Sequence, residues 1–189
     1  MLQGFYFESS AFSRNSFTID VFIHPLYIPD ESIALTFGNR LSLIAKGCDI
    51  WWEYEKTREK EISQEILSMT ANAGLPFLEK RNSIEKLLRQ YKGIKVNENK
   101  YIVEAVAYAH ILVDEYKKSE NMLRSFDIIL SHDIQQNPDI IWMNDIQNRV
   151  QMILGYLQNQ EYDVAKQKLN EWRNITLSNF GLYEDNDQN

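Results

Sequence analysis

Phe17-Thr18-Ile19-Asp20-Val21-Phe22-Ile23-His24 is the stretch of this sequence that decides its fold. The odd-numbered residues are all apolar, whereas the even-numbered residues are of mixed character. Side chains of a β-strand point alternately to its two faces, so this period of two predicts a strand with one wholly apolar face. Pro25 follows at once, and because proline lacks a backbone N–H we expect the strand to end there.

The residues around this strand extend the β-rich character over residues 1–56. This part holds 11 of the 23 aromatic residues, a residue class that suits a pleated surface. We expect a first strand over Leu2 to Glu8 and a hairpin in which Ile33 to Phe37 and Leu41 to Ala45 flank Gly38-Asn39. A further strand over Asp49 to Tyr54 places the two consecutive tryptophans on opposite faces.

From about residue 57 the apolar residues recur at helical spacing. A first helix is expected to end at Gly74, and a second to open near Asn82 or Ser83. Two helical hairpins follow, with helices over Tyr101 to Lys117, from there to Asn137-Pro138, over Ile141 to Gln158, and around a last segment from Tyr162.

These patterns together predict an α+β fold. A small, mainly antiparallel sheet in the N-terminal third is covered by helices, and a C-terminal bundle of helical hairpins follows. No linker rich in Gly, Ser or Pro separates the two parts, so we expect a single domain over residues 1–189. It comprises a β-rich layer (1–56), a helical part (57–182) and a frayed acidic tail (183–189).

Composition narrows the class of protein. The net charge is −7, and one Cys with three His leaves little material for disulfides or a metal site. Motifs for binding metals or nucleotide phosphates are absent from the sequence, so we expect no metal and no cofactor. No apolar run approaches the ~20 residues that span a bilayer, and the start lacks the pattern of a secretory signal. These features predict a cytoplasmic protein without a membrane partner.

Asp20 and His24 are the weak candidates for catalysis, because an acid on the same strand face can orient a histidine and raise its basicity. A spacing of four residues separates them by about 13 Å, so neighbouring strands would have to complete the site. If Asp20 and His24 meet Glu53 or Glu55 in a cleft between the sheet and the helices, the protein could be a hydrolase. The more ordinary interpretation is two polar residues on a partly solvated sheet face.

Two groups of residues are candidates for binding. Trp51, Trp52 and Tyr54 are of the kind enriched at interaction hot spots, although strand tryptophans more often fill the seam between a sheet and its helices. The second group is a basic cluster that includes Lys80, Arg81 and Arg89 and continues to Lys95. It could receive nucleic acid, but it lacks interleaved aromatic residues and the whole chain is acidic, so nucleic acid is the less favoured partner.

Two resemblances add to these patterns. The run His24-Pro25-Leu26-Tyr27-Ile28-Pro29, with Leu35 to Leu41 and Trp51-Trp52, resembles small bacterial proteins classified only as domains of unknown function, some of them immunity-like. This resemblance implies an α+β protein of bacterial origin with a partner-binding role, and it carries over no catalytic residues. The leading interpretation is therefore a non-enzymatic intracellular protein that binds another protein, as an immunity-like protein or an adaptor.

The second resemblance concerns residues 100–180, where the sequence partly matches itself at an offset of 46 residues. Glu115-Tyr116 corresponds to Glu161-Tyr162, Leu123 to Leu169, and Phe126 to Trp172. This segment resembles weak tetratricopeptide-like hairpins, in which small residues let two helices approach closely. The alternative is generic antiparallel packing of amphipathic helices.

Overall fold

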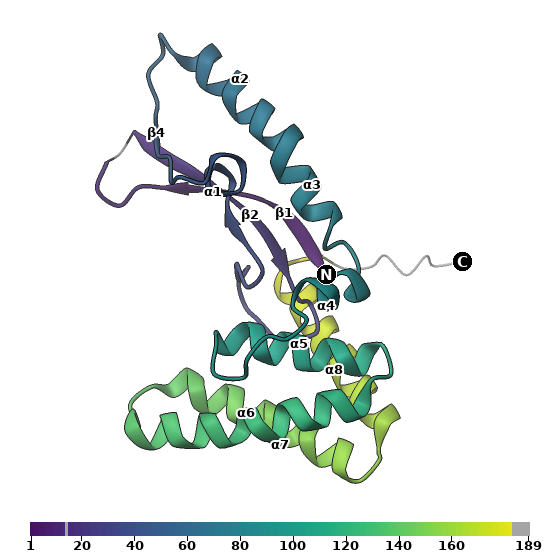
Figure 1. Ribbon diagram of the computed structural model, residues 1–189. Coiled ribbons are helices and arrows are strands. Elements are labelled where there is room, and N and C mark those ends of the chain that lie inside the picture. Colours follow the sequence, from purple (N-terminus) through teal and green to yellow (C-terminus); the bar gives the residue numbers. More distant parts are fainter. Residues whose placement is uncertain (14, 183–189) are drawn as a thin grey trace. The chain divides into compact units, whose positions relative to one another are not determined.

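A computed structural model describes residues 1–13 and 15–182, so the expected acidic tail lies outside the described residues. The fold is α+β, as predicted, with a small antiparallel sheet near the N-terminus and helices throughout the C-terminal part (Figure 1). The chain forms two compact units. Among the described residues, the sheet unit comprises 1–13, 15–25 and 33–86, and the helical unit comprises 26–32 and 87–182. That the two fold as a single domain stays a prediction.

In the described part of the chain the sheet has four strands: β1 (Leu2–Ser9), β2 (Ser16–His24), β3 (Asn39–Arg40) and β4 (Trp52–Glu53). β1 pairs antiparallel with one side of β2, and β3 and β4 pair with its other side. Nearly every residue of β2 is buried, which confirms the predicted apolar face and shows that the mixed face is covered as well. β2 is therefore the centre of the sheet unit.

The expected hairpin around Gly38-Asn39 is wrong. Residues 33–37 are not a strand, and residues 41–46 form the helix α1 (Leu41–Lys46), which ends at Gly47 with φ 74°. A short apolar run does not distinguish strand from buried helix, and here burial of Leu41 and Ser42 decides for the helix. Gly38 has a different role, because a Cβ atom there would lie 2.8 Å from the Val21 carbonyl oxygen.

The first predicted helix continues past its expected end. α2 (Glu59–Met69) runs through a π-helical turn, η1 (Thr70–Gly74), into α3 (Leu75–Glu79), and together they form one rod beside the sheet (Figure 1). Gly74 is helical and does not terminate the helix; a Cβ atom there would lie 2.7 Å from the Phe5 ring. The glycine thus lets the rod pack closely on β1. α4 (Ile84–Gln90) begins after Ser83, as predicted.

The helical unit contains α5 (Lys100–Leu112), α6 (Tyr116–Gln136), α7 (Ile141–Gln158) and α8 (Tyr162–Asn179). These bounds agree with the predicted hairpins, except that α5 ends before the expected Lys117. The segment 26–32 belongs to this unit: the Tyr27 hydroxyl donates to the Ala105 carbonyl (3.0 Å), and Thr176 Oγ1 donates to the Ile28 carbonyl (2.8 Å). None of the helices in the described part of the chain combines the length and apolar character that a bilayer crossing requires.

The two helical hairpins turn in the same way, at the 46-residue offset seen in the sequence. Asp114 and Gln160 both have positive φ, at 63° and 61°. In each turn the next residue, Glu115 or Glu161, donates its backbone N–H over 2.8 Å to a carbonyl five residues earlier. The rings of Tyr116 and Tyr162, at equivalent positions, stack with centroids 4.1 Å apart. Common ancestry of the hairpins stays a prediction.

Candidate functional site

The candidate site begins with a row of three side chains across the sheet. Asp20 of β2 lies opposite Tyr6 of β1 and opposite Arg40 of β3, so all three point to the same face. The Phe37 N–H donates a backbone hydrogen bond to the Ile23 carbonyl. Because bonded residues alternate along an antiparallel strand, the odd-numbered residues of β2 are the ones whose backbone groups bond on the β3 side. Asp20 and Arg40 therefore form a non-hydrogen-bonded pair, the kind in which opposite side chains lie closest.

Arg40 also contacts three residues outside this row, which are Glu8, Asp49 and Trp51. Its guanidinium lies 3.6 Å from Glu8 Oε2 and forms a hydrogen-bonded ion pair with Asp49. The guanidinium carbon also lies 4.9 Å from the centroid of the Trp51 ring, which is a cation–π contact. We call Glu8, Asp20, Arg40, Asp49 and Trp51 the Arg40 cluster. It contains three carboxyl groups and a single guanidinium, so negative charge is in excess.

Asp20 is the buried member of the cluster, with only 6% of its surface exposed. Burial raises the pKa of this carboxyl, and the nearby Glu8 and Asp49 charges raise it further, whereas Arg40 lowers it. A hydrogen bond between the Asp20 and Glu8 carboxyls acts in the same direction as burial. Asp20 therefore lies among carboxyl groups in a setting that favours its neutral form, and Arg40 is the one group there that opposes this.

The backbone of Ile50 holds the loop that carries Asp49 and Trp51. Its N–H donates to Ser42 Oγ (3.0 Å) in α1, and its carbonyl accepts from Thr18 Oγ1 (3.1 Å) in β2. Ser42 and Thr18 are fully buried, so both bonds are shielded from water. As a result Trp51 lies beside Arg40 with 36% of its surface exposed. Neither hydroxyl residue could be identified from the sequence, because their partner is a backbone group in a loop.

His24, the other catalytic candidate, lies elsewhere on the same strand. Its ring is fully buried, and Nδ1 accepts the Ala34 backbone N–H over 3.1 Å. Burial is the main cause that lowers its pKa. Four residues of extended chain, about 13 Å, separate it from Asp20, which is engaged with Glu8 and Arg40 instead. Glu53 and Glu55 are exposed. The structure thus assembles a site around Asp20 that does not include the expected histidine.

The two tryptophans lie on opposite faces of the sheet, as their alternation predicts. Trp52 is buried, lies 5.8 Å from the Phe17 ring, and donates from its indole to Glu65 of α2 over 2.9 Å. It is part of the core and is not a binding surface. Tyr54 is exposed. Among the three aromatic candidates, only Trp51 lies at the Arg40 cluster.

The basic residues 80–95 are divided between the two units. Lys80, Arg81 and Lys86 belong to the sheet unit, and the others belong to the helical unit. Arg81 donates to the Phe77 carbonyl and covers the Phe77 ring at 3.9 Å, and Lys86 donates to the Glu79 carbonyl and to Asn82. Arg89 is exposed. Arg81 and Lys86 therefore already form hydrogen bonds within the protein, and these bonds compete with contacts to the phosphates of a nucleic acid.

The described residues offer no group of three or more His, Cys, Asp or Glu side chains arranged to hold a metal ion. The three carboxyls of the Arg40 cluster lie near one guanidinium, which offsets only part of their negative charge. A protein cation is therefore the kind of group for which this arrangement is suited.

A second polar cluster lies inside the helical unit. Glu104 of α5 is fully buried, and both of its oxygens accept from Arg149 of α7, at 2.7 and 3.0 Å. Burial also raises the pKa of the nearby Asp30 to about 6. The sequence contained one signal for this pair, a glutamate within the apolar run of 101–113, because a charge on a buried helix face needs a partner. Its function is to join two helices.

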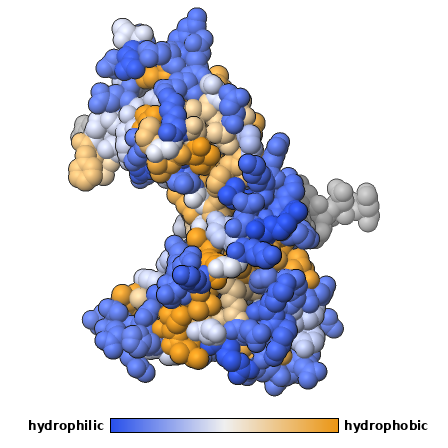
Figure 2. Space-filling model, in the orientation of Figure 1, coloured by the Kyte–Doolittle hydropathy of each residue, from blue (hydrophilic) through white to orange (hydrophobic). Residues whose placement is uncertain are grey.

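Apolar side chains are also exposed on both units. In the face drawn in Figure 2, hydrophilic residues cover most of the surface, and orange apolar patches remain between them. The largest exposed apolar residues of the helical unit include Ile128, Ile141 and Trp142, and Trp142 stacks on Tyr101 at 5.2 Å. Isolated exposed apolar residues are normal, so these alone indicate no particular partner.

Comparisons with protein-family models, with curated proteins and with solved structures found no match to this chain. The resemblances quoted from the sequence therefore stay predictions, and the Arg40 cluster is the feature of the structure that bears on function.

Proposed function

We propose that this chain is a cytoplasmic, non-enzymatic binding protein, of an immunity-like or adaptor type, which holds a basic side chain of a protein partner at the Arg40 cluster. One observation carries this proposal: three carboxyls and an exposed tryptophan surround a single guanidinium. A free, exposed Cys48 supports the cytoplasm, because reducing compartments keep such thiols unpaired.

The cluster itself shows how an arginine or lysine of a partner would be held. Arg40 lies against the Trp51 ring and between the Glu8 and Asp49 carboxylates, which combines a cation–π contact with charge-assisted bonds. The side chains of Glu8 and Asp49 are 43% and 41% exposed, so each still presents carboxylate oxygens to solvent. Tyr6, which is also exposed, adds a second ring on the same face.

Charge supports the same kind of partner at longer range. The chain carries a net charge of −7, which attracts basic proteins and speeds their encounter at low salt. The bound complex is therefore expected to weaken as salt is raised, because the exposed carboxylates that hold it are screened.

The test is capture from the native host with matched surface variants of the full chain. Wild type and Tyr54→Ala, an exposed aromatic outside the cluster, should retain the same partner. Trp51→Ala combined with Asp49→Asn should lose at least about tenfold in affinity for it, equivalent to about 1.4 kcal/mol. The retained partner should present a basic segment. Equal retention by all three proteins, or a partner without exposed Arg or Lys, contradicts the proposal.

A hydrolase is the second candidate, because burial and the neighbouring Glu8 raise the pKa of the Asp20 carboxyl, and acid–base catalysis uses carboxyl groups with raised pKa values. It predicts turnover of one substrate in a panel of esters, phosphoesters, peptides and glycosides, with the activity abolished in Asp20→Asn and retained in His24→Asn. Absence of turnover by wild type throughout the panel favours the binding function.

A further inference from the structure

β1 is an edge strand with one open side. It pairs only with β2, and no other strand among the described residues lies on its far side. None of its eight residues is buried, in contrast to nearly every residue of β2. A row of backbone groups is therefore open to another strand.

The register identifies these backbone groups. Ser10 N–H donates to the Ser16 carbonyl, so the even-numbered residues of this segment bond to β2. The N–H and C=O groups of Gln3, Phe5, Phe7 and Ser9 consequently point away from the sheet. No hydrogen bond to these groups from any described residue is present. The backbone groups of these four odd-numbered residues are thus available to pair with an added antiparallel strand.

Nothing in β1 protects this edge against pairing. The sequence Leu-Gln-Gly-Phe-Tyr-Phe-Glu-Ser carries one charge and no proline, and its register with β2 is continuous and free of bulges. Natural edge strands usually carry such devices to prevent association. An edge without them is a site for strand addition.

We propose that β1 pairs antiparallel with β1 of a second copy of this chain, about a two-fold axis at Tyr6. In this register Gln3 lies opposite Ser9 of the second copy and Phe5 lies opposite Phe7, so all four open positions become hydrogen-bonded pairs. Phe5 and Phe7 then form aromatic cross-strand pairs on one face, and Tyr6 meets Tyr6 on the other. Glu8 faces Gly4, which keeps the two carboxylates apart.

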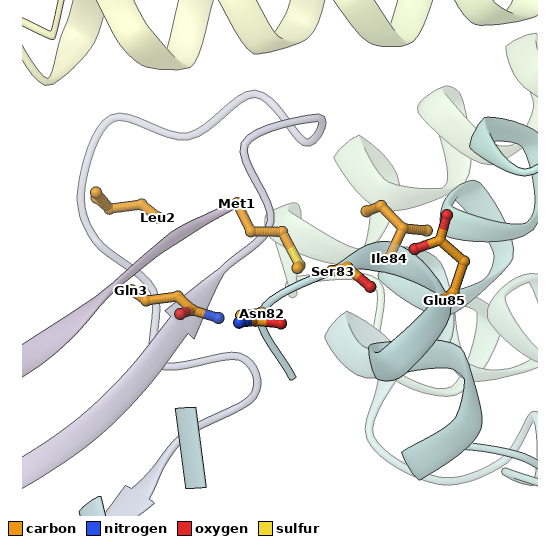
Figure 3. Close-up of a pocket in the computed structure, with 7 residues that line it drawn as sticks. All are labelled: Met1, Leu2, Gln3, Asn82, Ser83, Ile84 and Glu85. Carbon is orange, nitrogen blue, oxygen red and sulfur yellow. The ribbon is translucent and has the colours of Figure 1, made fainter. Parts of the chain in front are cut away.

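A pocket provides room for the end of the added strand. It measures about 500 Å³ and is lined by Met1, Leu2, Gln3 and the segment Asn82 to Glu85, all within the sheet unit. Figure 3 shows the Met1 and Gln3 side chains extending toward that segment, while Leu2 points the other way. The proposed register brings Ser9 and Ser10 of the second copy beside Gln3 and Leu2.

The axis can be tested by disulfide cross-linking of the full chain in a Cys48→Ser background, because Cys48 is exposed. Tyr6→Cys places the two thiols in a non-hydrogen-bonded pair with Cα atoms about 4.5 Å apart, and it should form a cross-linked dimer on mild oxidation. Ser9→Cys is the matched control, since its two copies lie six residues apart along the ladder, about 20 Å. Equal cross-linking of the two variants overturns the proposed register.

The edge itself is tested by sedimentation of wild type, Phe7→Pro and Phe7→Lys. The Phe7 N–H points away from β2, so proline removes an edge donor and leaves the β1–β2 ladder intact. Lysine keeps the backbone and adds charge to the edge. Each variant, with its fold checked by circular dichroism, should weaken the dimer at least about tenfold. A wild type that stays monomeric up to about 0.1 mM, or a dimer unaffected by either variant, overturns the proposal.

Discussion

Three polar residues, Thr18, Asp20 and His24, lie on the mixed face of β2, and each is accommodated in a different way. Thr18 bonds to the Ile50 carbonyl, Asp20 lies beside Glu8 and Arg40, and His24 accepts the Ala34 N–H. Asp20 is the one of these three residues that bears on the proposed function, because its neighbours Glu8 and Asp49 have side chains exposed to solvent. The other two hold loops against the strand.

His24 should make the sheet unit sensitive to acid. Because burial lowers its pKa in the folded chain below the ordinary 6.5, the unfolded chain binds the proton more readily. The contribution of His24 to stability is complete above pH 6.5 and is lost as the pH falls through the folded-state pKa.

His24→Asn keeps an acceptor for Ala34 and cannot titrate. Urea unfolding followed by tryptophan fluorescence should show less loss of stability between pH 7 and 5 in this variant than in wild type. Asp20, whose pKa is raised, acts in the opposite sense in both proteins, so an unchanged pH dependence would contradict the role of His24.

Arg40 should stabilise the sheet unit by offsetting the three carboxylates. Arg40→Met raises the pKa of Asp20 further, because the guanidinium is the group that lowers it. We expect a loss of about 1 kcal/mol in the free energy of unfolding at pH 7, a modest value because Glu8 and Asp49 are partly exposed. The loss should shrink in acid, where the carboxyls are protonated. Lys46→Met, which removes the exposed ion pair with Glu65, is the control and should cost less. A pH-independent loss in Arg40→Met would indicate packing instead of charge.

At the scale of elements, a buried ion pair joins α5 to α7. Both oxygens of Glu104 accept from Arg149, and their burial means that each charge depends on the other. Glu104→Gln should lower the free energy of unfolding of the helical unit by about 3 kcal/mol, because Arg149 then loses its buried counter-charge. The double variant Glu104→Leu with Arg149→Met should recover most of this loss, as measured by urea unfolding. A double variant as unstable as the single one would show that the pair contributes through shape and not through charge.

Gly38 directly precedes β3, and its lack of a side chain lets this segment lie close to the central strand β2. A Cβ atom at Gly38 would lie 2.8 Å from the Val21 carbonyl oxygen, which belongs to the backbone of the central strand and cannot move aside. Gly38→Ala should therefore cost about 1–3 kcal/mol and displace Arg40 from Asp20. Loss of the Arg40–Trp51 contact should be visible as a change in Trp51 fluorescence. An alanine variant with wild-type stability would show that the loop can shift without loss.

At the scale of the whole molecule, the question is whether the two units unfold together. Gly155 lies inside α7 with open space around its Cα, so Gly155→Ala should stabilise the helical unit by about 0.5–1 kcal/mol. If the chain is one cooperative domain, this variant and Gly38→Ala shift a single transition in opposite directions. If the units are independent, each variant shifts its own transition in calorimetry and leaves the other unchanged.

The sequence by itself determined the fold class, the central strand and the helices from residue 100 onward, with the end of α5 as the exception. These elements are long and strongly periodic, so their local pattern and their tertiary role agree. It also determined that Trp51 and Trp52 lie on opposite faces, because alternation is a property of the extended backbone.

Only the tertiary structure decided the short elements and the site. The run from Leu41 became a helix and Gly74 stayed inside one, because packing against β2 and Phe5 outweighed the local signal. The Arg40 cluster draws one residue each from β1, β2 and β3 and two from a loop, at sequence separations that no local pattern records. The pairing of strands brings these charges together, and that pairing depends on long-range burial.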